Sequence, residues 1–129
     1  MTQTPQNLTA HLGFAVPKLL AQAGISELFD SDMRFIAALY KKISNKYPHA
    51  ASYVIPNAFN RRVLLQMNLR SAFHFCHLRT APNAHFAIRR AAIRIADEIQ
   101  AGFPLFSKYF KPDSSENWLG LTEEYFERV

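Results

Sequence analysis

Polar side chains that could hold an anion are concentrated in one short stretch in the middle of the chain. The stretch contains Asn68, Arg70, His74, His77 and Arg79. Guanidinium groups donate several hydrogen bonds at once and stay charged at any working pH, so they suit phosphates and carbonyl oxygens. At 3.6 residues per turn, Arg70, His74 and His77 share one face of a helix. The stretch therefore predicts a cationic ligand site, although a solvated helix face would have the same composition.

These residues lie where a strand is expected to give way to a helix. Residues 59–67 alternate with the period of a strand. Helical spacing follows with Leu69, Ala72, Phe73 and Cys76, and we expect the Leu69, Phe73 and Cys76 stripe to lie opposite the cationic face. A helix that begins beside Asn68 offers unpaired backbone N–H groups and the positive end of its dipole, both of which favour a phosphate.

The rest of the chain is patterned mainly for helices. The expected helices cover residues 18–23, 31–47, 69–79 and 83–100, with a last one from Leu121. Asp30 or Ser31 would cap the second of these, and in the fourth we expect Ile88 to face inward and Arg89 outward. The chain has 11 Phe but only 4 Gly, which favours helices over a turn-rich sandwich. We predict an α/β (α+β) fold, helix-dominated, with a small antiparallel sheet.

The length and composition predict one globular domain. A chain of 129 residues with 49% hydrophobic content can bury a core of its own. We expect a flexible lead over residues 1–12, a single domain over 13–111 and a tail over 112–129.

Charge and cysteine content limit the partners and the compartment. The formal charge of +5 favours phosphates, nucleic acid or acidic partners. Cys76 is the only cysteine, which favours a reducing compartment. Neither a secretory signal nor a transmembrane run is evident, so we expect a cytoplasmic protein without a membrane partner.

Other chemistries are weakly indicated. His74 and His77, with Cys76 or His85, could be metal ligands, but a His pair without a second spaced ligand pair is a weak zinc signal, and we predict no metal. A cysteine on the apolar side of a helix usually serves as a small core residue. No glycine-rich phosphate loop and no inward pair of carboxylates is present. The residues alone indicate an anion-binding site on a small helical domain.

Three consecutive blocks carry a family resemblance. They are Tyr53–Pro56, Met67–Arg79 and Ala84–Arg89, and the second reads Asn-x-Arg-Ser-x-x-His-Phe-x-x-Leu-Arg. In order, spacing and residue type they resemble the C-terminal half of the flavin-dependent thymidylate synthases, the thymidylate synthase complementing proteins, over about residues 49–110. The resemblance implies FAD as cofactor and reductive methylation of dUMP to dTMP, with methylenetetrahydrofolate and NADPH as co-substrates. That reaction requires no enzyme nucleophile.

The resemblance also implies a role for each cationic residue. Asn68, Arg70 and His74 would bind the flavin. Arg79 would bind the pyrimidine of the nucleotide and polarise it, and is the candidate catalytic residue. The alternative is that Arg70 and Arg79 pair with acidic residues such as Asp97 or Glu98 and only hold the fold together, a contribution of about 0 to 1 kcal/mol for exposed pairs.

The sequence departs from the family pattern in two places. The Arg-His-Arg-x-x-Ser motif, which binds flavin and nucleotide, does not occur in these 129 residues. Ser52 stands where the family has an arginine that grips the nucleotide phosphate, and loss of such a contact costs about 2 kcal/mol.

We therefore expect the isolated chain to bind flavin weakly and to turn over nothing. A homo-oligomer or a second chain with the Arg-His-Arg motif would complete the site. Two other interpretations stay open: a non-catalytic binding or scaffold subunit derived from the family, and a small basic nucleic-acid-binding module. The last is the weakest, because no nucleic-acid-binding motif accompanies the positive charge.

Overall fold

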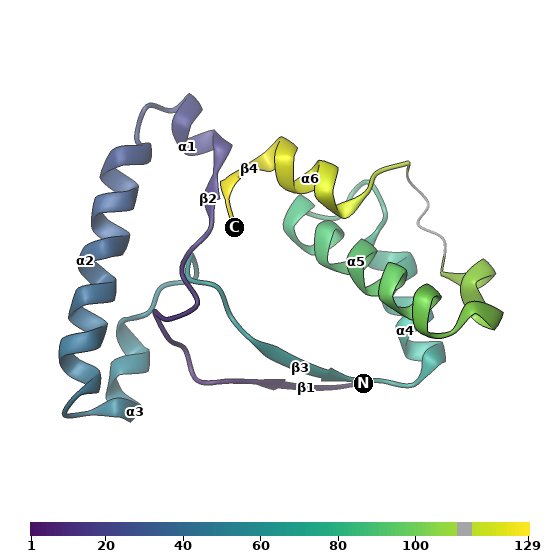
Figure 1. Cartoon of the computed structure of the whole chain (residues 1–129), viewed down its shortest axis with the longest axis horizontal. Helices are drawn as coiled ribbons and strands as arrows, with labels where there is room; N and C mark the ends of the chain where they lie inside the picture. The colour runs from purple at the N-terminus through teal and green to yellow at the C-terminus, as the bar shows by residue number, and fades with distance from the viewer. Residues whose placement is uncertain (111–114) are drawn as a thin grey trace. The chain divides into compact units, whose positions relative to one another are not determined.

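The fold consists mainly of helices with two short sheets (Figure 1). The computed structural model describes residues 1–110 and 115–129. Its elements are β1 (Thr2–Pro5), β2 (Val16–Pro17), α1 (Lys18–Gln22), α2 (Ser26–Ser44), α3 (Pro48–Ala51), the 3-10 helix η1 (Ser52–Val54), β3 (Val63–Gln66), α4 (Leu69–Arg79), α5 (Phe86–Gly102), the 3-10 helix η2 (Pro104–Tyr109), α6 (Trp118–Tyr125) and β4 (Phe126–Arg128). Strand β1 pairs with β3, and β2 pairs with β4 in antiparallel orientation. The predicted helix-dominated α+β fold is confirmed.

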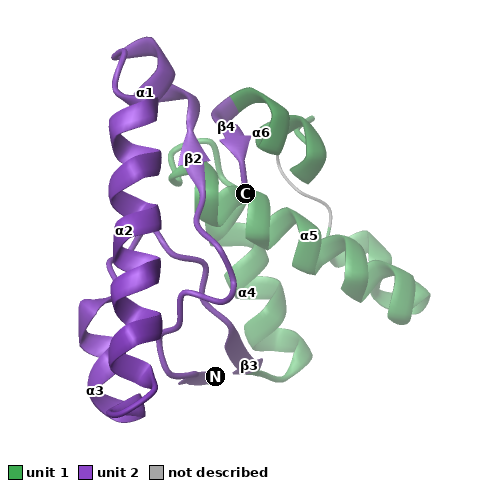
Figure 2. Ribbon diagram, turned by 60° about the vertical axis from the view of Figure 1, so that its left-hand side comes forward, with its two compact units in different colours: residues 1–2, 66–124 green, residues 3–65, 125–129 purple. Residues whose placement is uncertain are grey.

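The chain divides into two compact units (Figure 2). Unit 1 contains Met1–Thr2 and Gln66–Glu124, and unit 2 contains Gln3–Leu65 and Tyr125–Val129. The segment predicted to be a flexible lead includes strand β1. The boundary predicted between residues 111 and 112 lies outside the described residues, so the domain and tail assignments stay predictions.

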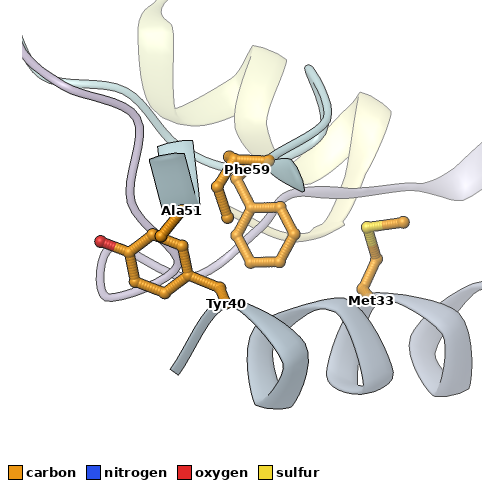
Figure 3. Packing of buried hydrophobic residues seen from close by; sticks show 5 residues of the cluster. Met33, Tyr40, Ala51 and Phe59 are labelled. Atoms are coloured by element: carbon orange, nitrogen blue, oxygen red, sulfur yellow. The ribbon is translucent and has the colours of Figure 1, made fainter. Parts of the chain in front are cut away.

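Unit 2 is built around one buried face of α2. Met33 and Tyr40, seven residues apart on that helix, pack with Ala51, Ile55 and Phe59. Figure 3 shows the Met33 and Tyr40 side chains pointing from the helix toward Phe59 and Ala51. The helix predicted for residues 31–47 is therefore confirmed, although it begins earlier and ends at Ser44.

The predicted start of α2 is wrong. The helix begins at Ser26, so Asp30 and Ser31 lie inside it and neither caps it. The Asp30 carboxylate instead accepts hydrogen bonds from Arg34, one turn later, and from Arg128 of β4 at 2.7 Å. No glycine or proline interrupts Ser26–Ser31, so the helix extends to an earlier residue than the best capping residues suggest.

The predicted strand over residues 59–67 is too long, because only Val63–Gln66 form β3. Phe59 is 2% exposed and pairs with Phe14 in an isolated antiparallel bridge. The next residue, Asn60, donates its backbone N–H to Gly13 O at 2.9 Å and its side-chain amide to Leu12 O at 3.0 Å. Core packing and these hydrogen bonds hold residues 59–60 beside the 12–14 segment instead of in the sheet.

In unit 1, α4 packs against α5. Helix α4 spans Leu69–Arg79, as predicted. The predicted inward stripe is only partly right: Cys76 is buried, but Leu69 is 37% and Phe73 is 41% exposed. The second buried residue is Ala72, which packs with Cys76, Ala96 and Phe110. Small residues at this contact allow the two helix backbones to approach closely.

Helix α5 departs from its prediction at its start and in its faces. It begins at Phe86, and the His85 ring caps it by accepting a hydrogen bond from Ala87 N–H at 3.3 Å. Ile88, predicted to face inward, is 36% exposed, whereas Ile93 is 1% exposed. Arg89, predicted to face outward, is 7% exposed, because its guanidinium donates to the carbonyl oxygens of the loop before the helix and to Glu116.

The other two helix predictions need smaller corrections. Helix α1 ends at Gln22, one residue earlier than predicted, and the following Gly24 has a φ of 71°. Helix α6 begins at Trp118, three residues before the predicted Leu121, which is buried inside it at 1% exposure.

Candidate functional site

The candidate site lies on α4, whose start is fixed by Asn68. The Asn68 backbone is extended, and its side-chain Oδ1 accepts a hydrogen bond from the backbone N–H of Ser71 at 2.9 Å. An asparagine in this position satisfies one of the N–H groups that a helix leaves unpaired at its first turn. The side-chain oxygen of Asn68 is therefore occupied by the helix cap, and its NH2 group is the donor that remains for a ligand.

A cavity of about 660 Å³ opens along α4. It is lined by Met1, Arg70, Ser71, Phe73, His74, Phe75, Leu78 and Arg79, all of which belong to unit 1. Three of the four predicted site residues, Arg70, His74 and Arg79, thus share one cavity. Asn68 is not among the lining residues, although it caps the same helix.

His77 is placed differently from Arg70 and His74. Its ring stacks on Phe73, with 6.1 Å between ring centroids and 11° between ring planes. Phe73 also contacts Phe110 in a T-shaped arrangement, with ring centroids 6.2 Å apart. Of the two histidines on α4, His74 is therefore the one that lines the cavity.

Within residues 1–110 and 115–129, neither arginine of the cavity holds the fold together by an ion pair. Arg70 and Arg79 are exposed, and neither forms a salt bridge with another residue in the described ranges. The pairing with Asp97 or Glu98 that was the structural alternative is not observed among those residues. Both guanidinium groups therefore keep hydrogen-bond donors that a ligand could use.

Apolar side chains complete the cavity beside these cations. Phe73, Phe75 and Leu78 provide flat or branched apolar surface, while Arg70, His74 and Arg79 provide donors. Ligand sites commonly combine mostly apolar walls with a few polar groups that fix the orientation. This lining suits a ligand that has both a planar ring and an anionic group.

Cys76 is on the buried side of the same helix and does not belong to the cavity. It is 4% exposed, and its Sγ lies 3.9 Å from Ala92 O. Burial raises the pKa of the Cys76 thiol to about 11, so the thiolate is scarce near neutral pH. Cys76 is thus a core residue and not a nucleophile.

Metal binding and membrane spanning can be examined for the part of the chain that the structure describes. Within residues 1–110 and 115–129, no three His, Cys, Asp or Glu side chains are grouped so that they could hold a metal ion. Among the helices of those residues, none combines the length and the apolar content that crossing a bilayer requires.

Comparison with known families identifies the chain. The family described as thymidylate synthase complementing protein matches residues 2–105. The chain belongs to this family. The family assigned from the three sequence blocks is therefore confirmed.

Individual relatives fall into two groups. The chain is 33% identical over 125 residues to a UPF0159 protein of Chlamydia muridarum, an alignment that covers 96% of this chain and 24% of the relative. It is 35% identical over 63 residues to the flavin-dependent thymidylate synthase of Sulfolobus acidocaldarius, covering 49% of this chain and 24% of that protein. The corresponding enzyme of Pyrococcus furiosus is 29% identical over 91 residues, which is 67% of this chain and 36% of the enzyme. No solved structure matches the chain.

The chain therefore spans only about a quarter of the length of the first of these relatives.

Sequence reasoning missed part of the cavity. Ser71, Phe75 and Leu78 were not recognised, although they follow from helix geometry. Residues four apart lie above one another on a helix, so Leu78 continues the row of Arg70 and His74, and Ser71 and Phe75 form the row that ends at Arg79. Met1 could not have been found in this way, because it is 69 residues from Arg70.

Ser52 stands where the sequence comparison with the family predicts a phosphate-binding arginine, and its side chain is engaged in a local hydrogen bond. Ser52 is the first residue of η1, and its hydroxyl donates a hydrogen bond to His49 O at 2.9 Å. Serine cannot replace the two parallel hydrogen bonds of a guanidinium group, and here its single donor is used by the backbone.

Proposed function

We propose that this chain supplies the flavin- and nucleotide-binding half of a thymidylate synthase complementing protein site. The observation that carries the proposal is the single cavity lined by Arg70, His74 and Arg79, in which both arginines lack an ion-pair partner among the described residues. The reaction served would be the reductive methylation of dUMP to dTMP, or of a related pyrimidine nucleotide.

The length of the cavity favours more than one ligand group. Arg70 and Arg79 are nine residues apart on α4, which separates their Cα atoms by about 13 Å along the helix axis. A flavin near Arg70 and a pyrimidine near Arg79 would together occupy that distance.

Each residue has a defined task in this proposal. Arg70 donates to an anionic or carbonyl oxygen of FAD, His74 orients the flavin one turn further along the helix, and the Asn68 NH2 group adds a donor at the helix start. Phe73 and Phe75 offer ring surfaces to the planar part of a ligand. Arg79 donates to a carbonyl oxygen of the pyrimidine and withdraws electron density from its ring.

FAD fits the donors and apolar surfaces that the cavity offers, and when bound it would supply the hydride that completes the methyl group. In this proposal the chain binds, orients and polarises, and its one cysteine, which is buried in the core, does not act as a nucleophile. Methylenetetrahydrofolate and NADPH are the proposed co-substrates, by the family relationship. A cytoplasmic location is part of the same proposal, because a free thiol and reduced cofactors suit a reducing compartment.

The site requires further residues. The Arg-His-Arg-x-x-Ser motif is absent from these 129 residues, so we propose that a second polypeptide segment with the motif completes it. By itself the chain should bind flavin weakly and should not form thymidylate.

One observation favours a second candidate, a binding or scaffold subunit that performs no chemistry. The phosphate-binding arginine of the family is replaced by Ser52, whose donor is already used by His49 O. If the substrate phosphate is not held, the chain could bind flavin without turning over a nucleotide.

A flavin titration tests the main proposal. FAD is added to the purified chain and to Arg70→Ala, and binding is followed by quenching of flavin fluorescence. The matched control is Arg62→Ala, because Arg62 is also an exposed arginine but does not line the α4 cavity. We expect Arg70→Ala to weaken binding about tenfold or more and Arg62→Ala to change it less than twofold.

The result that would contradict the proposal is equal binding by the parent chain and Arg70→Ala. Equal loss in both variants would also contradict it, because the effect would then follow overall positive charge and not the cavity. Thermal melting of all three proteins separates loss of binding from loss of folding.

A further inference from the structure

Helix α2 carries an exposed apolar stripe away from its buried face. Leu28 is 64% exposed, Phe35 is 69% exposed, and Leu39 is partly exposed. None of the three is in the cluster formed by Met33 and Tyr40 of the same helix. Isolated exposed apolar residues are ordinary, but three on one side of one helix indicate a contact surface.

The spacing of this stripe is the spacing of helix pairs. Leu28, Asp32, Phe35, Leu39 and Lys42 follow one another at intervals of four, three, four and three residues. Such alternation keeps side chains on a single seam where one helix packs along another. We call these five residues the α2 seam.

The charges of the α2 seam match only one orientation of a second identical helix. In an antiparallel pair whose two-fold axis lies level with residue 37, midway between Phe35 and Leu39, Phe35 lies opposite Leu39 of the other copy, and Asp32 lies opposite Lys42. In a parallel pair, Asp32 would face Asp32 and Lys42 would face Lys42. Like charges at such positions oppose association.

The charged members of the seam are available for this pairing. Asp32 and Lys42 are exposed, and neither forms a salt bridge with another residue in the described ranges. The helix has 19 residues and is therefore about 28 Å long, enough to hold the whole seam.

We propose that two copies of this chain associate through antiparallel α2 helices, joined by the Phe35–Leu39 contacts and the Asp32–Lys42 ion pairs of the α2 seam. The proposal does not depend on the proposed function, because no seam residue lines the α4 cavity.

Light scattering across a range of protein concentrations tests the association, with Phe35→Asp as the disrupting variant. The expected result is a concentration-dependent dimer for the parent chain and at least a hundredfold weaker association for Phe35→Asp. Because Phe35 is 69% exposed, the variant should keep its circular dichroism spectrum and melting temperature. Leu105→Asp is the matched control: Leu105 is 81% exposed, lies on η2 and should leave the dimer unchanged.

Charge reversal tests the orientation. Asp32→Lys and Lys42→Asp should each weaken the dimer about tenfold at low salt, since each breaks both symmetric ion pairs and creates repulsion. The double variant Asp32→Lys with Lys42→Asp should restore the affinity to within about threefold of the parent, because the pairs are re-formed with reversed polarity.

Three results would overturn the proposal: a parent chain that stays monomeric at the highest concentration, a dimer that Phe35→Asp leaves intact, and a double variant that is no stronger than the single ones. The first would mean that some other segment or partner covers the seam. The second would place the dimer contact elsewhere, and the third would exclude the antiparallel pairing.

Discussion

Arg89 is buried on α5 and holds Glu116, 27 residues later, by two contacts. Its Nη2 donates to Oε1 at 2.9 Å, and its Nε lies 2.9 Å from Oε2. The same guanidinium donates through Nη1 to Pro82 O at 2.8 Å and to Ala84 O at 3.2 Å. One side chain thus joins the start of α5, the loop before it and the segment that leads into α6.

This arrangement predicts a large cost for Arg89→Leu. The substitution removes the hydrogen bonds from Arg89 to Glu116 and to two carbonyl oxygens, so the free energy of unfolding should fall by about 3 kcal/mol. Trp118, the only tryptophan, reports unfolding of unit 1 by fluorescence. Glu116→Gln, which keeps an acceptor for Arg89, should cost about 1 kcal/mol. If Arg89→Leu and Glu116→Gln lowered the free energy of unfolding by equally small amounts, the Arg89–Glu116 contact would not be stabilising.

Asn68 allows the helix cap and the ligand contact to be separated. Asn68→Ala should lower the free energy of unfolding by about 1 kcal/mol, because the Ser71 N–H loses its acceptor. Asn68→Asp keeps the acceptor, so stability should be retained, but the NH2 donor is lost and FAD affinity should fall. Chemical denaturation and flavin titration of both variants measure the two effects. An Asn68→Asp chain that binds FAD like the parent would limit this residue to capping.

The buried thiol of Cys76 predicts a pH dependence of stability. Burial raises the pKa of Cys76 from an ordinary 9.0 to about 11, so the folded state holds this proton more tightly than the unfolded state does. Its contribution is complete below pH 9 and is lost as the pH rises through about 11, by about 3 kcal/mol in total. Cys76→Ala should flatten the alkaline limb of the stability profile. Parallel profiles of the parent and the variant would contradict this prediction.

Arg79 should act on the nucleotide and not on the flavin. In the presence of FAD, Arg79→Ala should weaken dUMP binding about tenfold, while FAD affinity changes less than about twofold. Arg79→Lys keeps the charge but not the planar fork of donors, so it should recover only part of the affinity. Isothermal titration with dUMP measures these differences. A loss of FAD affinity that equals the loss of dUMP affinity would place both ligands at one end of α4.

Local signals predicted α4 and its cationic face, because they are encoded within the helix itself. Asn68 is a strong capping residue, and Arg70 and His74 are one turn apart in any helix that starts there. The same kind of signal predicted the helix α2, whose buried residues include Met33 and Tyr40.

Features that depend on distant residues could not be predicted in this way. The helical pattern alone predicts that Arg89 is exposed, and its burial depends on the contact with Glu116, 27 residues away. Phe59 reads as the start of a strand, but its ring packs against Phe14 and is drawn into the core of unit 2. Leu69 and Phe73 are apolar at helical spacing, yet the smaller Ala72 occupies the contact with α5.

The central claim, that the α4 cavity binds flavin, is tested most directly by locating FAD on the protein. Nuclear magnetic resonance spectra of the chain, with side-chain signals of arginine and histidine resolved, are recorded during an FAD titration. The account predicts that the side-chain signals of Arg70 and His74 shift first. The Arg79 signal should shift further on addition of dUMP, and the Arg62 signal should not change. Shifts confined to residues outside α4, with Arg70 and His74 unchanged at saturating FAD, would contradict it.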